Sequence, residues 1–315
     1  MPTRKSPRKG SLQFWPRKRA RKFLPRVNYN SIESGKGLKG FICYKAGMVS
    51  LAVKDNTPNS KTKDKKIILP GTVLECPTVK IFSVRFYKDG KVVKETLNEG
   101  LDKELKRQIK LPKTKKKVDL EKKDDFDDVK VIIYSQTKKT GIKKVPDLTE
   151  VGLTGSLDEK LNFVKENLNK EISAFDVFEN GQLVDLRGLT KGKGLVGPVK
   201  RFGITLKSHK SEKGRRRPGS LGPWHPARVT FRAPQAGQLG MFTRVQYNNK
   251  IMSIGKASES NNLWNIKNFG NVKTDYIIVQ GSIQGSSKRQ LIITMPLRES
   301  KKQSKKSYEL LEVLR

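Results

Sequence analysis

The chain has 315 residues, 35% of them apolar, and a formal net charge of +37. That charge far exceeds the magnitude of about 2–8 that keeps a small domain soluble, so we expect a polyanionic partner that neutralises it. Two cysteines, two histidines and no run of eighteen apolar residues argue against a disulfide framework, a metal site and a spanning helix. The composition predicts a cytoplasmic protein that needs no cofactor.

Residues 1–38 are predicted to form a basic N-terminal extension. Their first 26 positions hold ten Lys or Arg and no acid. Phe14, Trp15 and Phe23 are interleaved with these cations, which is unusual in a purely solvated tail. We therefore expect an arm that becomes ordered on its partner.

Strand patterns begin at Gly40. β-branched and aromatic residues with partial alternation predict strands over residues 40–55, 67–76 and 79–95. In the last of these runs Asp89-Gly90 separates two alternating segments, which predicts a tight hairpin. Residues 39–97 are accordingly assigned to the first part of a β-barrel.

An inserted segment of mixed structure is predicted over residues 98–170. Near its start, leucine and isoleucine recur at four-residue spacing, which predicts a short amphipathic helix with an apolar face made of Leu101, Leu105 and Ile109. The run Lys113–Lys117 indicates an exposed loop, and residues 129–136 indicate a strand. Bases and acids nearly balance over residues 99–130, as on an ordinary solvated surface.

The second helix of the insert has a clear start signal. Ser156 followed by Glu159 matches a capping box, and the next apolar residues share one helical face, namely Leu157, Leu161, Val164 and Leu168. A second β-hairpin is predicted over residues 171–187, around Asn180-Gly181.

The rest of the chain divides into a long basic loop over residues 188–250, a final part of the barrel over 251–298, and a C-terminal tail over 299–315. Strand-like runs at residues 276–283 and 290–295 close the pattern. Strands predominate and helices are confined to the insert, so the fold class is mostly β with an α+β insertion, built on a small barrel or sandwich.

The long loop has an extreme charge distribution. Residues 187–256 contain sixteen Lys or Arg and a single acid, Glu212. The stretch "GLTKGKG" is not a nucleotide-binding P-loop, because it has one residue too few between its glycines and lacks the hydroxyl residue that binds magnesium. Its glycines instead indicate a backbone that passes close to another group, with Lys191 and Lys193 available to phosphate.

Within this loop, "GPWHPARV" sets Trp224 and His225 between two prolines. Pro223 and Pro226 disfavour a helix, so we interpret Trp224 as a contact residue that stacks on a base, and not as core. His225 has two readings that the sequence leaves open, a neutral ring bonded to backbone or a contact to RNA. The three arginines at 215–217 suit bidentate contact with phosphate.

The nature of the polyanion follows from where the cations lie. Readers of duplex DNA usually present a helix to the major groove, whereas these cations occupy loops and tails with glycines and aromatic residues. Such segments suit irregular RNA. Two other classes remain open: an RNA enzyme, which would need a carboxylate or histidine constellation that the basic region lacks, and a chromatin-type DNA binder.

Six motifs occur in an order that resembles one family, the large-subunit ribosomal protein numbered three in its archaeal and eukaryotic form. They are "GSLQFWPRKRA", "GFICYKAGM", "TKGKGLVGPVKRFG", "LGPWHPARV", "PQAGQLGMFTR" and "GNVKTDYIIVQGSI". The resemblance covers about residues 8–295. It implies a translation-factor-like β-barrel, with the arm and the loop reaching through large-subunit rRNA and Trp224 at the loop tip near the peptidyl-transferase centre.

The same resemblance implies a role in early subunit assembly and a position near the docking region of elongation factors. It also implies that the chain is no enzyme and takes no small-molecule substrate. Its partners would be large-subunit rRNA and neighbouring proteins of that subunit, with no membrane and no homo-oligomer. The location would be cytoplasmic, in the large ribosomal subunit.

The residues predicted to contact rRNA are mainly cations of the two basic segments, joined by a few aromatic and polar side chains. They are Arg4, Lys5, Arg8, Lys9, Trp15, Arg17, Lys18, Arg19, Arg21, Lys22, Lys191, Lys193, Lys200, Arg201, Lys207, His209, Lys210, Lys213, Arg215, Arg216, Arg217, Trp224, His225, Arg228, Arg232, Gln238 and Arg244.

Overall fold

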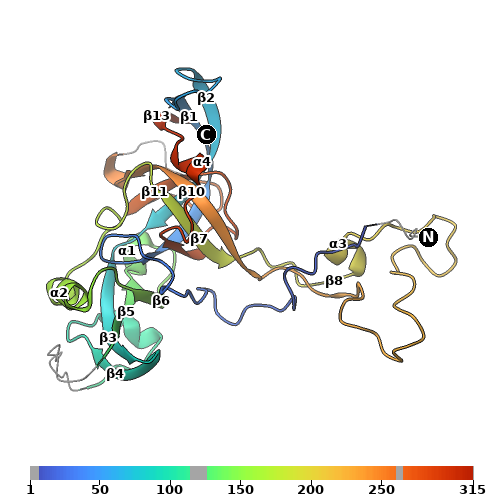
Figure 1. Cartoon of the computed structure of the whole chain (residues 1–315), viewed down its shortest axis with the longest axis horizontal. Coiled ribbons are helices and arrows are strands. Elements are labelled where there is room, and N and C mark those ends of the chain that lie inside the picture. Colours follow the sequence, from blue (N-terminus) through green and yellow to red (C-terminus); the bar gives the residue numbers. More distant parts are fainter. Residues whose placement is uncertain (1–6, 114–125, 260–264, 315) are drawn as a thin grey trace. The chain divides into compact units, whose positions relative to one another are not determined.

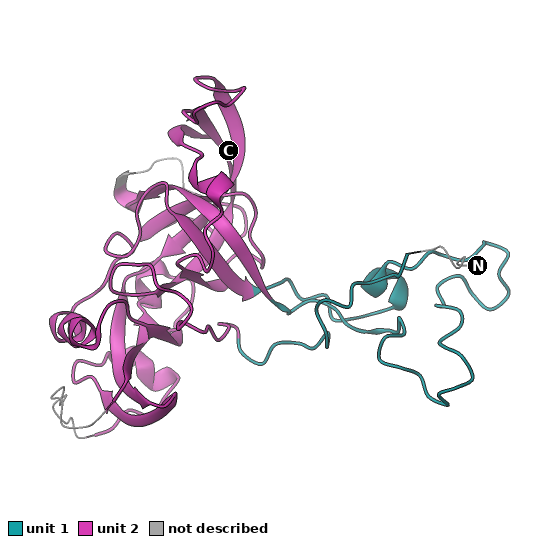
Figure 2. Ribbon diagram, viewed as in Figure 1, with its two compact units in different colours: residues 1–22, 189–243 teal, residues 23–188, 244–315 magenta. Residues whose placement is uncertain are grey.

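The computed structural model describes residues 7–113, 126–259 and 265–314, and these belong to two units (Figure 2). Residues 1–22 and 189–243 form the first unit, which we call the basic lobe. Residues 23–188 and 244–315 form the second, the β unit. The chain therefore leaves the β unit after Gly188 and returns to it at Arg244.

The larger sheet of the β unit has seven strands in the described residues, in the order β12-β7-β10-β11-β2-β1-β13. Figure 1 labels β1, β2, β7, β10, β11 and β13 of this sheet. Their bounds are β1 Gly40–Asp55, β2 Lys66–Cys76, β7 Leu183–Leu189, β10 Thr243–Gly255, β11 Asp275–Gln280, β12 Gln290–Thr294 and β13 Tyr308–Leu314. β12 also pairs with β1. The six strands from β12 to β1 in this order are therefore paired in a closed circuit, and β13 lies outside it. The mostly β fold class is confirmed.

Strand β1 organises this sheet because it is long enough to pair with three neighbours. Its first half is antiparallel to β12, from Gly40 opposite Thr294 to Tyr44 opposite Gln290. Its second half pairs with β13, and β2 follows it along nearly its whole length. The strand β13 lies where the sequence predicted a tail, because Tyr308, Leu310 and Val313 pack against a small apolar cluster.

A smaller sheet has the order β4-β3-β5-β6, with β3 Val79–Lys88, β4 Lys91–Leu97, β5 Asp128–Ser135 and β6 Leu148–Gly152. The predicted hairpin between β3 and β4 is confirmed. Asp89 and Gly90 have φ values of +48° and +71°, the pair of positive angles that a tight two-residue hairpin turn needs. The strand predicted at residues 129–136 is confirmed as β5.

The helix predicted from the capping box is also confirmed, as α2 Leu157–Asn167. The backbone N–H of Glu159 donates to Ser156 Oγ at 3.4 Å, and the N–H of Ser156 donates to Glu159 Oε2 at 3.0 Å. Leu161 and Val164 are buried in the main core. The N-terminal capping box and the buried face of α2 thus follow from local sequence.

The amphipathic helix predicted near residue 105 is wrong. The structure has a short 3₁₀ helix, η1 Lys103–Arg107, in which Leu105 is buried while Ile109 beyond it is exposed. Asp102 precedes η1 but gives it no side-chain cap, because its carboxylate is bound elsewhere. Residues 114–117 of the predicted exposed loop lie outside the described residues.

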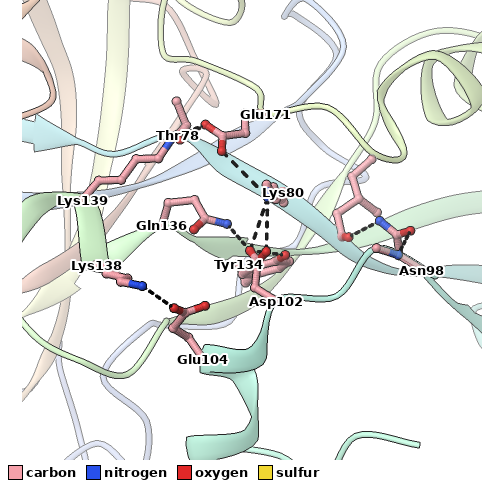
Figure 3. A network of polar contacts seen from close by, with 12 residues as sticks. Thr78, Lys80, Asn98, Asp102, Glu104, Tyr134, Gln136, Lys138, Lys139 and Glu171 are labelled. Atoms are coloured by element: carbon pink, nitrogen blue, oxygen red, sulfur yellow. Dashed lines mark hydrogen bonds and ion pairs between the residues drawn. The ribbon is translucent and has the colours of Figure 1, made fainter. Parts of the chain in front are cut away.

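Asp102 belongs to a polar network that ties the insert to the smaller sheet (Figure 3). Its carboxylate accepts hydrogen bonds from Tyr134 Oη at 2.8 Å and Gln136 Nε2 at 2.6 Å, and pairs with Lys80 at 3.3 Å. Burial raises the pKa of Asp102, but the bonds from Gln136 and Tyr134 and the Lys80 charge outweigh burial, so the pKa lies below its usual value.

The second predicted hairpin, at residues 171–187, is wrong in its first half. Only β7 forms a strand there; Ser173 to Phe178 make a turn in which the Asp176 carboxylate accepts from the Ser173 N–H at 2.7 Å. The turn buries Val177 and Phe178 in the main core, and this packing overrides the strand pattern. Gly181 then donates its N–H to the Ile251 carbonyl at 2.9 Å.

The last part of the predicted N-terminal extension also differs from expectation. Tyr29, Ile32 and Leu38 are buried in the main core of the β unit, so residues 23–38 belong to that unit. Their spacing matches neither a strand nor a helix, and they stand in a segment rich in cations. For both reasons the sequence did not indicate that these three residues are buried.

The basic lobe contains little regular structure. Among its described residues it has one short helix, α3 Pro198–Phe202, and two short paired strands, β8 Leu195–Val196 and β9 Gly237–Gln238. Residues 203–236 form no helix or strand, in agreement with their lack of periodicity. The remaining short elements are α1 Thr137–Thr140, η2 Ala257–Glu259 and α4 Lys301–Ser304. In the described ranges, no helix has the length and apolar character required to cross a membrane.

Candidate nucleic-acid interface

The basic lobe combines a high positive charge with a nearly complete lack of acids. Residues 1–22 contain nine Lys or Arg, and residues 189–243 contain twelve, against Glu212 as the one acid. Cations so placed repel one another in the absence of a counter-charge. The lobe is therefore the part of the chain in which a polyanion would lower the electrostatic free energy most.

The N-terminal arm is packed on the long loop through aromatic rings. Trp15 stacks on Phe202, with ring centroids 6.1 Å apart and an interplanar angle of 26°. The Arg17 guanidinium lies 4.3 Å from the Phe202 centroid and 5.5 Å from that of Trp15. Arg17 also donates to the Arg201 carbonyl at 2.8 Å. Trp15 and Arg17, both predicted to contact RNA, thus join the arm to the loop.

Arg201 fixes the other side of the loop base. Its Nε donates to the Gln238 carbonyl at 3.0 Å and its Nη1 to the Gln235 carbonyl at 3.1 Å. The amide of Gln238 donates to the carbonyls of Leu239 and Gly240. Arg201 and Gln238 therefore stabilise the fold of the lobe, and part of their hydrogen-bonding capacity is already used.

Within "GLTKGKG", Gly192 passes close to the Met241 side chain of the same chain, and Gly240 on the returning segment of the loop passes close to the Lys191 backbone. A Cβ on Gly240 would lie 2.0 Å from the Lys191 carbonyl oxygen, and one on Gly192 would lie 3.1 Å from Met241. The N–H of Lys193 donates to the Leu239 carbonyl at 3.0 Å. The two ends of the loop are therefore held together as a narrow neck.

Beyond this neck, residues 221–230 are all exposed. Trp224 leaves 87% of its surface in water, so it is not a core residue of this structure. His225 is exposed too, and none of the hydrogen bonds found among the described residues joins its ring to the backbone. The structure thus gives no support to the interpretation of His225 as a ring bonded to its own backbone.

Most other predicted contact residues are exposed as well. These are Arg8, Lys9, Lys18, Arg19, Arg21, Lys22, Lys191, Lys193, Lys200, Lys207, His209, Lys210, Lys213, Arg215, Arg216, Arg217, Arg228 and Arg232. Two of these make side-chain bonds within the lobe, since Arg8 donates to the Arg232 carbonyl and Arg215 to the Lys207 carbonyl. Arg244 is half-buried in β10 of the β unit, and Arg4 and Lys5 lie outside the described residues.

Phe231 is a residue of this surface that the sequence prediction missed. It is 70% exposed, and its ring meets Trp15 edge-on, with centroids 5.7 Å apart and an interplanar angle of 66°. A cavity of about 540 Å³ lies beside it. The signal was present, because Phe231 is an aromatic residue next to Arg232 in an acid-free segment, the same pattern that singled out Trp15.

The sequence matches the family described as Ribosomal protein L3 over residues 1–314. The chain belongs to the ribosomal protein L3 family. A relative from Methanobrevibacter smithii is 40% identical over 313 residues, covering 94% of this chain and 93% of the relative. Relatives from Methanocaldococcus jannaschii (37%, covering 93% and 91%) and Archaeoglobus fulgidus (39%, covering 90% and 89%) are similar; all three are named large ribosomal subunit protein uL3.

Membership of the L3 family confirms the resemblance found from the six motifs. The match extends past both ends of the stretch that carried them, through the C-terminal strand β13. It is a family of ribosomal proteins and not of enzymes, as the sequence indicated. In the parts of the chain that the structure describes, His, Cys, Asp and Glu form no cluster of three or more that could hold a metal ion.

Proposed function

We propose that this L3-family chain is a structural constituent of the large ribosomal subunit. It binds large-subunit rRNA through the basic lobe, supports early assembly of the subunit and extends the loop tip toward the peptidyl-transferase centre. It works in the cytoplasm as a single copy beside neighbouring large-subunit proteins. The exposure of Trp224 at the end of an acid-poor loop is the observation that supports this proposal best.

A tryptophan in water at 87% exposure leaves a large apolar face without a partner. Within the loop, Trp224 is flanked by the cations Arg217 and Arg228, which can bind phosphates on either side of a stacked base. Stacking of a base on an aromatic ring contributes about 1–3 kcal/mol. Ring and cations together therefore suit an irregular RNA surface better than duplex DNA.

The β unit has a different part in this proposal. We infer that the six strands whose pairings form a closed circuit make a translation-factor-like barrel that anchors the protein on the subunit. Closure leaves these strands with few free edges, which suits a rigid anchor. Movement on binding RNA is then confined to the basic lobe.

The test of the loop role is Trp224→Ala, with Val229→Ala as the matched control. Val229 is also exposed, at 51%, in the same loop. Both variants should incorporate into large subunits and keep the thermal stability of the free protein. Altered transfer-RNA binding or peptidyl transfer should be seen in ribosomes that carry Trp224→Ala and not in those that carry Val229→Ala. Unfolding of the Trp224 variant, combined with normal ribosomes, would show that the ring serves folding only.

The test of subunit membership is sedimentation of the tagged chain with large subunits in high salt. A constituent remains bound, because many buried contacts hold it, whereas a loose basic binder dissociates as salt screens its charges. Competition binding at stated salt then separates the DNA-binding alternative. Equal affinity for any duplex DNA and for large-subunit RNA would contradict the proposal.

A further inference from the structure

We infer that the cavity beside Phe231 is a pocket for one unstacked RNA base. This inference rests on the proposed function and names the ligand of one part of the basic lobe. The cavity has a volume of about 540 Å³, within the roughly 300–1,000 Å³ typical of small-ligand pockets. Its lining residues all belong to the basic lobe; they come from residues 15–18 of the arm, from Arg201 in α3 and from residues 230–236 of the loop.

Phe231 supplies the stacking surface. Its edge-on contact with Trp15 fixes the ring at the cavity wall, yet 70% of the residue remains in water. Trp15 is itself held by Phe202 and by a hydrogen bond from its Nε1 to the Ser11 carbonyl at 2.8 Å. An aromatic platform that is exposed but already oriented loses little side-chain entropy when a base stacks on it.

The charges around the cavity favour a nucleotide over an apolar ligand. Arg17, Lys18 and Arg201 line it, and none of its lining residues is acidic in the described part of the chain. The guanidinium of Arg232 lies 5.7 Å from the Phe231 centroid. Arg17 and Arg201 are held by the lobe's own carbonyls, so their charge stays in place, while Lys18 is exposed and can meet a phosphate.

The identity of the base is not restricted by this lining. Gln235 is the lining residue with a side-chain amide, a group that has both a donor and acceptors for a base edge. Stacking itself tolerates any base, since every base has a π face. The pocket therefore recognises an extruded nucleotide by its shape and charge and is tolerant of sequence.

The experiment is chemical probing of large-subunit rRNA, base by base, in subunits that carry the full-length chain. Phe231→Leu keeps most of the apolar bulk beside Trp15, but it removes the π face. Phe231→Tyr keeps the ring. We expect one nucleotide to become reactive with Phe231→Leu and with Phe231→Ala, and to stay protected with Phe231→Tyr and in the exposed control Val229→Ala.

The size of the effect follows from the stacking energy. About 1–3 kcal/mol corresponds to a loss of roughly 5- to 150-fold in occupancy of the pocket by the base. Identical reactivity of every nucleotide in the wild-type and Phe231→Leu subunits would overturn the inference, and the pocket would then hold something other than a base. Failure of the proposed function looks different, because the unmodified chain would protect no large-subunit rRNA at all.

Discussion

The Arg17 guanidinium lies 4.3 Å from the ring centroid of Phe202, although the two residues belong to the two separate chain segments that make up the basic lobe. Trp15 stacks on the same ring, so a cation and an indole share one phenyl group. These contacts give the lobe a small folded base of its own. The exposed tip of the loop is therefore attached to a folded base.

The first prediction concerns this base. Arg17→Ala should loosen the arm more than Lys18→Ala does, because Lys18 is exposed whereas Arg17 contributes ring contacts and a bond to the Arg201 carbonyl. Cation–π contacts contribute about 0.5–2 kcal/mol and a charged hydrogen bond about 1.5–3 kcal/mol. Limited proteolysis of the free protein measures the difference as faster cleavage within residues 7–22. Equal cleavage of both variants would contradict a role of Arg17 in holding the arm.

The second prediction concerns order in the lobe. Residues 203–236 form no helix or strand, and residues 221–230 are all exposed, so most of their amides should exchange rapidly in the free protein. The neck should exchange more slowly, because Thr190 and Lys193 donate their N–H groups to Phe242 and Leu239. Hydrogen exchange with and without large-subunit RNA checks both statements. Strong protection of the loop in free protein would show that RNA is not needed to order it.

Local signals predicted the parts of the fold that depend on neighbours in sequence. Asp89-Gly90 defines its hairpin and Ser156 with Glu159 defines its helix within four residues. The basic segments were likewise visible, since charge is a property of composition. The contacts within the lobe were not, because Arg17 and Arg201 are 184 positions apart. No periodicity links such residues, and only the folded chain brings them together.

The errors have a related cause. An amphipathic helix was predicted from Leu101, Leu105 and Ile109, but only the short η1 forms. The Asp102 carboxylate before it accepts a hydrogen bond from Tyr134, 32 positions away, and gives η1 no side-chain cap. In the same way Phe178 reads as strand but is buried through a turn. Tertiary packing overrides local propensity at both sites. The sequence therefore predicted an element correctly where the residues that stabilise it are neighbours in the chain, and incorrectly where they are far apart in the chain.

The third prediction concerns the Asp102 network shown in Figure 3. Asp102→Asn removes a carboxylate that accepts from Tyr134 and Gln136 and pairs with Lys80, so it should lower the free energy of unfolding by about 1–3 kcal/mol near neutral pH. Glu104→Gln is the control. Its bond with Lys138 lies in solvent, and such pairs contribute about 0–1 kcal/mol.

The pH dependence of that effect has a definite sign. The pKa of Asp102 is lower in the folded than in the unfolded chain, so the carboxylate contributes stability above its unfolded pKa of about 3.9. This contribution is lost as the pH falls through the folded pKa. Urea unfolding at pH 7 and pH 3 should therefore show a smaller difference between wild type and Asp102→Asn at the lower pH. If the difference in free energy of unfolding were the same at both pH values, Asp102→Asn would destabilise the fold through packing alone.

The fourth prediction has the opposite sign and concerns Glu75. This buried residue accepts hydrogen bonds at Oε1 from the backbone N–H groups of Lys273 and Thr274, while its Oε2 has no partner in the described part of the chain. Burial raises the pKa of Glu75 above its usual value, and the hydrogen bonds offset this only in part. The charged form therefore destabilises the fold once the pH exceeds the unfolded pKa of about 4.3.

Glu75→Gln removes that charge while it keeps a carbonyl oxygen for the two N–H donors. Its free energy of unfolding relative to wild type should therefore increase as the pH is raised from 4 through the folded pKa of Glu75, and then stay constant. Urea unfolding across this range gives the measurement, with the half-buried Glu104→Gln as a control. The pKa of Glu104 is lowered by a hydrogen bond from Lys138, so its effect on stability develops below the unfolded pKa of about 4.3, and that variant should change little relative to wild type as the pH rises further. If the free energy of unfolding relative to wild type followed the same pH dependence in both variants, the charge of Glu75 would have no influence on folding.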